Sequence, residues 1–229
     1  MGLFNRSVSV AEAGLFKGRT DWHCHILPGV DDGFKNMEDS LRALALYERA
    51  GIEQVWLTPH IMEDIPNTTE DLQLRFAELK AVYTGPISLH LASENMMDPL
   101  FAERLEEDDL LPLPDKRLLV ETSYFNPPYD LDGILERVKS VGYFPLLAHP
   151  ERYMYMEMRH YRALKAKKIE FQLNISSLAG AYGSTVKAKA ERLLAAGMYD
   201  YSGTDLHRVS SFEHLLQARF SKKVLRRIP

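Results

Sequence analysis

The stretch TDWHCHILPGVDDG, residues 20–33, is the part of this sequence from which both the fold and the chemistry can be predicted. It begins as a short strand and places His23 and His25 on either side of Cys24. Because successive side chains of a strand point to opposite faces, the two imidazoles share one face and the thiol lies on the other. Two aspartates, Asp31 and Asp32, follow near the end of the segment. It therefore offers either a reactive thiol or a group of metal ligands.

The thiol is the weaker of these two interpretations. A cysteine-dependent phosphatase needs an arginine after five intervening residues, and Val30 occupies that position here. A reactive thiol also needs a cationic neighbourhood that lowers its pKa. We therefore expect Cys24 to be packed in the core and chemically inert.

Short apolar or β-branched segments alternate with longer helical patterns about seven times along the chain. The expected strands are RTDWH, QVWLTP, ISLHLASE, RLLVET, YFPLLAH, IEFQLN and MYDYSGTD. The expected helices cover residues 37–50, 69–83, 100–107, 130–141, 159–167, 184–196 and a last segment from about 210. This alternation predicts a parallel α/β sheet with right-handed crossovers, either open and doubly wound or closed into a barrel.

Nearly every predicted strand ends in a residue that can bind a metal ion. These residues are His23, His25, His60, Glu94, Glu121, His149, Asp205 and His207. In a closed barrel such strand ends converge on one mouth, whereas an open sheet spreads them along a crevice, so the barrel is favoured. Burying these groups together with Asp32 would be costly without a cation. Imidazole and carboxylate ligands suit Mn, Fe or Zn and indicate an open, multinuclear catalytic centre.

The composition indicates one globular domain. The chain has 229 residues, a formal net charge of -4 and a pI near 6.1, and this acidic balance argues against nucleic-acid binding. A single cysteine, no signal peptide and no membrane-length apolar run predict a cytoplasmic protein without stable membrane insertion. We expect a domain at residues 19–229, preceded by an N-terminal extension, residues 1–18, that is either an added helix or a contact in a homo-oligomer.

Four motifs, DWHCHILPGVDDG, LTPH, AHPERY and SGTDLH, together resemble the PHP superfamily, named for polymerase and histidinol phosphatase domains. Within it they look most like the bacterial manganese-dependent tyrosine phosphatases of capsular and exopolysaccharide systems. The resemblance covers almost the whole chain from about Thr20 onward. It implies a distorted, TIM-like (β/α)7 barrel and three divalent metal ions, with Mn preferred and Fe or Zn as alternatives.

The resemblance also implies which residues bind the metal ions. The implied ligand sets are His23, His25, Glu94 and Asp205 for one ion, Glu94, Glu121 and His149 for a second, and Asp32, His60 and His207 for a third. Arg152 is the candidate catalytic residue that grips the phosphate through two oxygens, with a surface ion pair as its alternative role. Asp205 is the candidate for assisting proton transfer.

The reaction implied by this resemblance is metal-assisted hydrolysis of phosphotyrosine on a protein. The implied partner is a tyrosine autokinase that controls polysaccharide export. The aromatic segments TSYFNPPYD and ERYMYMEMRHY are interpreted either as walls for the phosphotyrosyl ring or as ordinary packing. Alternative functions are a histidinol-phosphate phosphatase, a nuclease, which the acidic balance disfavours, and a non-catalytic kinase-binding module, which the full ligand set disfavours.

Overall fold

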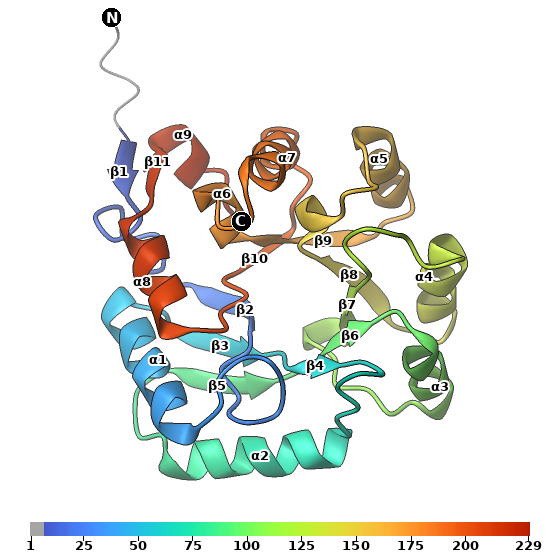
Figure 1. Cartoon of the computed structure of the whole chain (residues 1–229), viewed down its shortest axis with the longest axis horizontal. Helices are drawn as coiled ribbons and strands as arrows, with labels where there is room; N and C mark the ends of the chain where they lie inside the picture. Colours follow the sequence, from blue (N-terminus) through green and yellow to red (C-terminus); the bar gives the residue numbers. More distant parts are fainter. Residues whose placement is uncertain (1–6) are drawn as a thin grey trace, which may run out of the picture.

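Parallel strands form the inner layer of the computed structural model, which describes residues 7–229, and helices lie around them (Figure 1). A six-stranded sheet has the order β10-β9-β8-β7-β6-β4, and a three-stranded sheet has the order β2-β3-β5. The strands are β2 Thr20–Cys24, β3 Gln54–Leu57, β4 His60–Ile61, β5 Ser88–Leu91, β6 Glu94–Met96, β7 Arg117–Glu121, β8 Phe144–Ala148, β9 Glu170–Asn174 and β10 Tyr201–Gly203. The fold is therefore mixed α/β with a curled parallel sheet, as the alternating pattern predicts.

The two parallel sheets are connected at both sides. The strand predicted from ISLHLASE is interrupted and forms β5 in one sheet and β6 in the other, and β3 and β4 divide in the same way. On the opposite side, β2 lies beside the end of β10. There the Asp205 amide donates to the His23 carbonyl at 2.8 Å, and the His25 amide donates to the Leu206 carbonyl at 3.0 Å.

The helices follow the sequence pattern closely. The longer ones are α1 Met37–Ala50, α2 Thr69–Val82, α3 Pro99–Glu107, α4 Leu131–Ser140, α5 Met158–Ala166, α7 Ser184–Ala195 and α8 Val209–Gln217. Each of the predicted helix boundaries is confirmed to within one residue. Side-chain caps explain this accuracy, because Asn36 and Thr68 each accept a hydrogen bond from a backbone amide in the first turn of α1 and α2. The short helices α6 Ile175–Ala179 and α9 Lys222–Leu225, and the 3₁₀ turns Pro114–Lys116 and Pro150–Arg152, were not predicted.

The N-terminal part of the chain packs against its C-terminal part. Strand β1 Ser7–Ser9 pairs antiparallel with β11 Arg219–Ser221. Residues 10–18 form turns in place of the added helix, and Val10, Leu15 and Phe16 are buried in the main hydrophobic core. Residues 1–6 of the predicted extension lie outside the described residues.

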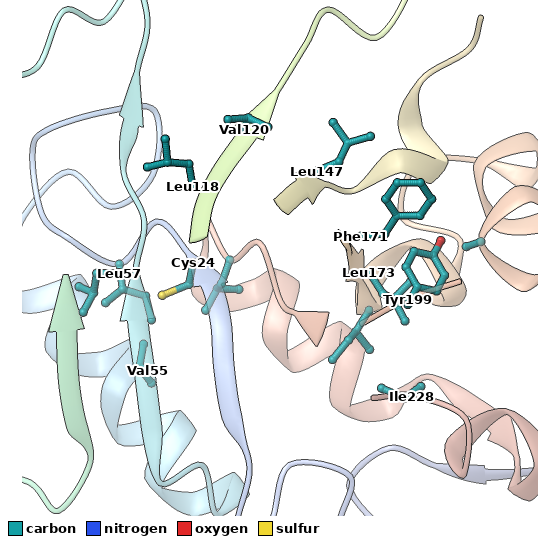
Figure 2. Packing of buried hydrophobic residues seen from close by; sticks show 14 of the residues in the cluster. Cys24, Val55, Leu57, Leu118, Val120, Leu147, Phe171, Leu173, Tyr199 and Ile228 are labelled. Atoms are coloured by element: carbon teal, nitrogen blue, oxygen red, sulfur yellow. The ribbon is translucent and has the colours of Figure 1, made fainter. Parts of the chain in front are cut away.

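Cys24 belongs to the hydrophobic core. Its side chain is fully buried and lies beside Leu57 of the neighbouring strand (Figure 2). Burial raises the pKa of the thiol well above its ordinary value, so the group stays protonated and unreactive. Among residues 7–229, no helix combines the length and apolar character needed to span a membrane.

Candidate metal centre

The two histidines of the opening motif meet at the carboxyl end of β2. The rings of His23 and His25 are fully buried, and their Nε2 atoms lie 3.1 Å apart. Cys24 points to the core between them, as the strand alternation predicts. The backbone of one short strand therefore aims two imidazole nitrogens at one point.

Glu94 lies where these histidines converge. Its Oε2 atom is 3.1 Å from His23 Nε2, 3.3 Å from His25 Nε2 and 3.2 Å from His60 Nδ1. Despite this crowding, Oε2 is buried without a hydrogen-bond partner, and so is His60 Nδ1. Ligands about 2.1 Å from a common ion lie roughly 3.0–3.5 Å from one another. The contacts have the spacing of atoms that share a cation, and the donor set fits a divalent metal.

The candidate ligand atoms form three overlapping groups, in each of which they lie within 4.8 Å of one another. The groups are His23, His25, Glu94 and Asp205; His25, Asp32, His60 and His207; and His60, Glu94 and Glu121. The structure thus brings the predicted ligands together. His149 is outside these groups, but its Nε2 lies 2.8 Å from Glu94 Oε1 and 3.7 Å from Glu121 Oε2.

Hydrogen bonds on the far side of the imidazoles fix their orientation. His23 Nδ1 donates to Gln172 Oε1 at 3.0 Å, and His25 Nδ1 donates to Asp31 Oδ2 at 2.7 Å. His207 Nδ1 donates to the backbone carbonyl of Asp205 at 2.9 Å. Each of these bonds leaves the Nε2 lone pair free to bind a metal.

Three polar residues beside the proposed ligands, Asp31, Gln172 and Asn174, were missed by the sequence analysis. Asp31 was passed over in favour of its neighbour Asp32, whose side chain is 64% exposed and lies 3.2 Å from His207 Nε2. Gln172 and Asn174 are polar side chains two residues apart in the otherwise apolar end of β9. The same two-residue spacing that identified the histidines could have identified this pair.

The carboxylates of the cluster are held in their ionised form. Burial opposes ionisation of Glu94, but the nearby His23 and His60 outweigh it, so its pKa lies well below the ordinary value. Burial likewise opposes ionisation of Asp205, and the surrounding histidines lower its pKa. Burial disfavours the charged form of His23, but Glu94 and Asp205 raise its pKa to about 9. The cluster therefore attracts positive charge, as protons or as a cation.

Unusual backbone conformations place two of the site residues. His149 has φ 32° and Asp205 has φ 52°, a left-handed region that non-glycine residues seldom adopt. Two residues before Asp205, Gly203 packs directly on His23: a Cβ at this position would lie 2.6 Å from the His23 Cβ. The strand ends are thus shaped around the imidazoles.

Arg152 lies at the edge of the cluster. Its side chain is 17% exposed, and its Nη1 donates to Asp205 Oδ2 at 2.9 Å. It borders a cavity of about 860 Å³ that also exposes His60, Glu94, His149 and Asp205. Two aromatic residues, Tyr124 and Tyr182, line the same cavity.

The aromatic segments have mixed environments. Tyr124 lines the cavity, whereas Phe125 is 73% exposed and Tyr129 is fully exposed. In the second segment, Tyr153 is fully buried and donates to the Ala148 carbonyl at 2.9 Å. Tyr153 is therefore a packing residue of the core, whereas Tyr124 forms part of the cavity wall.

Known proteins resemble this chain over most of its length. Residues 19–223 match the family described as capsular polysaccharide synthesis, CpsB/CapC. The chain is 30% identical to the tyrosine-protein phosphatase YwqE of Bacillus subtilis, over 83% of this chain and 78% of that protein. It is 23% identical to the putative tyrosine-protein phosphatase CapC of Staphylococcus aureus, over 90% of this chain and 84% of that protein.

Solved structures give the same relationship. A crystal structure from work on Bacillus subtilis YwqE and Streptococcus pneumoniae CpsB, described as unique metal-dependent tyrosine phosphatases, matches with a TM-score of 0.79 and 26% identity, over 91% of this chain and 90% of that chain. The phosphotriesterase homology protein of Escherichia coli matches with a TM-score of 0.54 and 11% identity, over 93% of this chain and 96% of that chain. The second likeness concerns the fold alone.

Proposed function

Because the chain belongs to the CpsB/CapC family of capsular polysaccharide synthesis, we propose that it is a metal-dependent protein-tyrosine phosphatase. Its substrate is a phosphotyrosine-bearing protein, with a tyrosine autokinase that controls capsular or exopolysaccharide synthesis as the expected partner. The relatives named as tyrosine-protein phosphatases support this assignment. We place the reaction in the cytoplasm, where such a kinase domain would be accessible.

Residues 19–229 are the proposed catalytic domain, with residues 1–18 as an extension. We interpret its parallel strands as a distorted (β/α)7 barrel, in which β3 with β4 and β5 with β6 each count as one staggered strand. The hydrogen bonds between the ends of β2 and β10 support closure of such a ring. In a barrel of this kind the carboxyl ends of the strands form the active-site mouth.

Divalent cations are the proposed cofactors, three in number and preferably Mn²⁺. The proposed ligands are His23, His25, Asp32, His60, Glu94, Glu121, His149, Asp205 and His207. The observation that carries this proposal is Glu94 Oε2, which three imidazole nitrogens approach within 3.3 Å without satisfying it by a hydrogen bond. Bound cations supply Lewis acidity to the phosphate and lower the pKa of water.

Arg152 and Asp205 are the residues that we propose to bind the phosphate and to assist proton transfer. Arg152 binds phosphate oxygens through the N–H groups that Asp205 does not occupy. Asp205 Oδ2 accepts hydrogen bonds from Arg152 and, at 2.8 Å, from Asn174 Nδ2, which fixes the carboxylate. Its Oδ1 lies 3.5 Å from His23 Nε2 and faces the other proposed ligands, and we assign assistance in proton transfer to this carboxylate.

Hydrolysis of a phosphotyrosyl peptide by metal-loaded protein, with and without a chelator, tests this function. We expect chelation to abolish the activity and manganese to restore it. Glu94→Gln should lose more activity than the roughly 10- to 100-fold typical of residues that only support a ligand. Glu191→Gln, an exposed carboxylate on α7, is the matched control.

The choice of substrates separates the alternative functions. A clear preference for histidinol phosphate over the phosphotyrosyl peptide would reassign the enzyme, and cleavage of single-stranded DNA would indicate a nuclease. A metal-loaded protein that is inert on every phosphate ester but binds a kinase would contradict catalysis altogether.

A further inference from the structure

The guanidinium of Arg152 packs against two aromatic rings. Its Cζ lies 4.1 Å from the ring centre of Tyr124 and 4.3 Å from that of Tyr182. Tyr124 follows β7, and Tyr182 lies in the connection between α6 and α7, so two distant segments of the chain meet at this side chain. Such short distances correspond to stacking of the guanidinium on the ring faces.

Hydrogen bonds restrain the guanidinium less than these rings do. Within residues 7–229 its one side-chain hydrogen bond runs from Nη1 to Asp205 Oδ2. Nε and Nη2 therefore have no protein partner among the described residues, although Arg152 borders the cavity. One hydrogen bond at one nitrogen does not fix the plane of a guanidinium, whereas contacts with ring faces do.

The rings are themselves tied to the cluster. The Tyr124 hydroxyl donates to Glu121 Oε2 at 3.4 Å, and the Tyr182 hydroxyl donates to Asp205 Oδ2 at the same distance. Asn174 Nδ2 donates to the Tyr182 hydroxyl at 3.0 Å. The orientation of both rings is thus set relative to residues that surround the candidate metal centre.

We propose that Tyr124 and Tyr182 are positioning residues that hold the Arg152 plane and thereby preorganise an anion subsite beside the metal centre. Stacking occupies the faces of the guanidinium and leaves its N–H edge to donate two parallel hydrogen bonds to a phosphate. An arginine that is already ordered loses less conformational freedom when the anion binds. This inference rests on the proposed phosphatase function, and it assigns to Tyr124 and Tyr182 the orientation of Arg152 for phosphate binding.

Inorganic phosphate is the probe that isolates this role, because it has no ring of its own to contact the tyrosines. Its affinity for metal-loaded protein can be measured by isothermal titration calorimetry. Tyr124→Leu and Tyr182→Leu should each weaken phosphate binding by about 3- to 30-fold, the size of one partly buried cation–π contact. Tyr124→Phe and Tyr182→Phe, which keep the ring face and lose only the hydroxyl, should bind phosphate more tightly than the matching leucine variants.

A double-variant comparison tests whether the rings act through Arg152. We expect Tyr182→Leu to have no further effect on phosphate affinity once Arg152→Ala is present. Tyr129→Leu, in the same loop as Tyr124 but fully exposed, is the matched control. The metal content of each variant should equal that of the parent protein, and thermal unfolding should show that each variant is folded at the temperature of the titration. Tyr124→Met replaces Tyr124→Leu if that variant does not fold.

Two results would overturn the inference. Unchanged phosphate affinity in both leucine variants, together with a raised KM for a phosphotyrosyl peptide, would show that the rings contact the substrate instead. An additional loss in the Arg152→Ala background would show that they act independently of the arginine. Because phosphate binding needs no turnover, this experiment gives an answer even if the protein proves not to hydrolyse phosphotyrosine.

Discussion

Replacing Asp31 by asparagine tests how strongly the metal centre depends on the carboxylate behind His25. Asp31 Oδ2 accepts from His25 Nδ1 at 2.7 Å and from the His60 backbone amide at 3.1 Å. Its Oδ1 accepts from the Gly33 amide at 2.9 Å, and the residue is 9% exposed. Asparagine keeps the shape of this side chain and removes its charge.

The expected effect follows from the loss of one buried, charge-assisted hydrogen bond. Such a bond contributes about 1.5–3 kcal/mol, and about 1.4 kcal/mol corresponds to a tenfold change in a binding constant. We therefore expect Asp31→Asn to raise the Kd for Mn²⁺ by about 10- to 100-fold, the range found when a ligand loses its supporting partner. Activity at saturating Mn²⁺ should recover in part, because Asp31 is not itself one of the proposed ligands.

Competition between the protein and a calibrated chelator gives the Kd for Mn²⁺ of each variant. Asp64→Asn removes a comparable but exposed carboxylate and should leave the Kd unchanged. If folded Asp31→Asn bound Mn²⁺ as tightly as the parent protein, the carboxylate would not orient His25 for metal binding, and the reasoning would be refuted.

Three further variants or conditions test the rest of the site. Cys24→Ala should keep kcat/KM and lower the free energy of unfolding by about 1 kcal/mol in urea titrations, because the thiol faces the core; an inactive, metal-loaded variant would contradict this. Gly203→Ala adds a Cβ 2.6 Å from the His23 Cβ, so calorimetry should show a Tm lowered by roughly 2–4 °C for each kcal/mol of strain, and an unchanged Tm would count against the close packing. Burial opposes protonation of His23, but Glu94 and Asp205 raise its pKa from 6.5 to about 9. With chelator present, protonated His23 therefore stabilises the folded state fully below pH 6.5, and this contribution to the free energy of unfolding is lost as pH rises through 9. The Tm in chelator should then fall between these pH values, and a Tm that rises would refute the charge assignment.

The features that were predictable from sequence depend on local geometry. Alternation along β2 placed His23 and His25 on one face, and capping residues such as Asn36 fixed where helices begin. The division of one strand into β3 and β4 was harder to predict from sequence, although Pro59 lies at the break and cannot donate to a ladder hydrogen bond.

The sequence resemblance implied that Glu94 is shared between two ions, but the position of His25 and His60 in two groups each could not be predicted. His25 groups with Asp32, His60 and His207 as well as with His23. The loop after β2 returns to the end of that strand, where the Phe34 amide donates to the His25 carbonyl at 3.2 Å. Tyr182 was also missed, since it lies in an irregular connection whose path depends on the packing of α6 and α7. Periodicity describes which face a residue occupies, but distances between strand ends are set by the tertiary structure.

The left-handed conformations of His149 and Asp205 have a consequence for how this protein can be improved. Glycine or asparagine would adopt the left-handed conformation at either position at a lower cost. With histidine or aspartate there, each position carries a backbone strain of about 1–3 kcal/mol. Laboratory selection for heat resistance alone would therefore tend to accept inactivating replacements at these positions. Heat tolerance and turnover must be screened together if a robust and working catalyst is wanted.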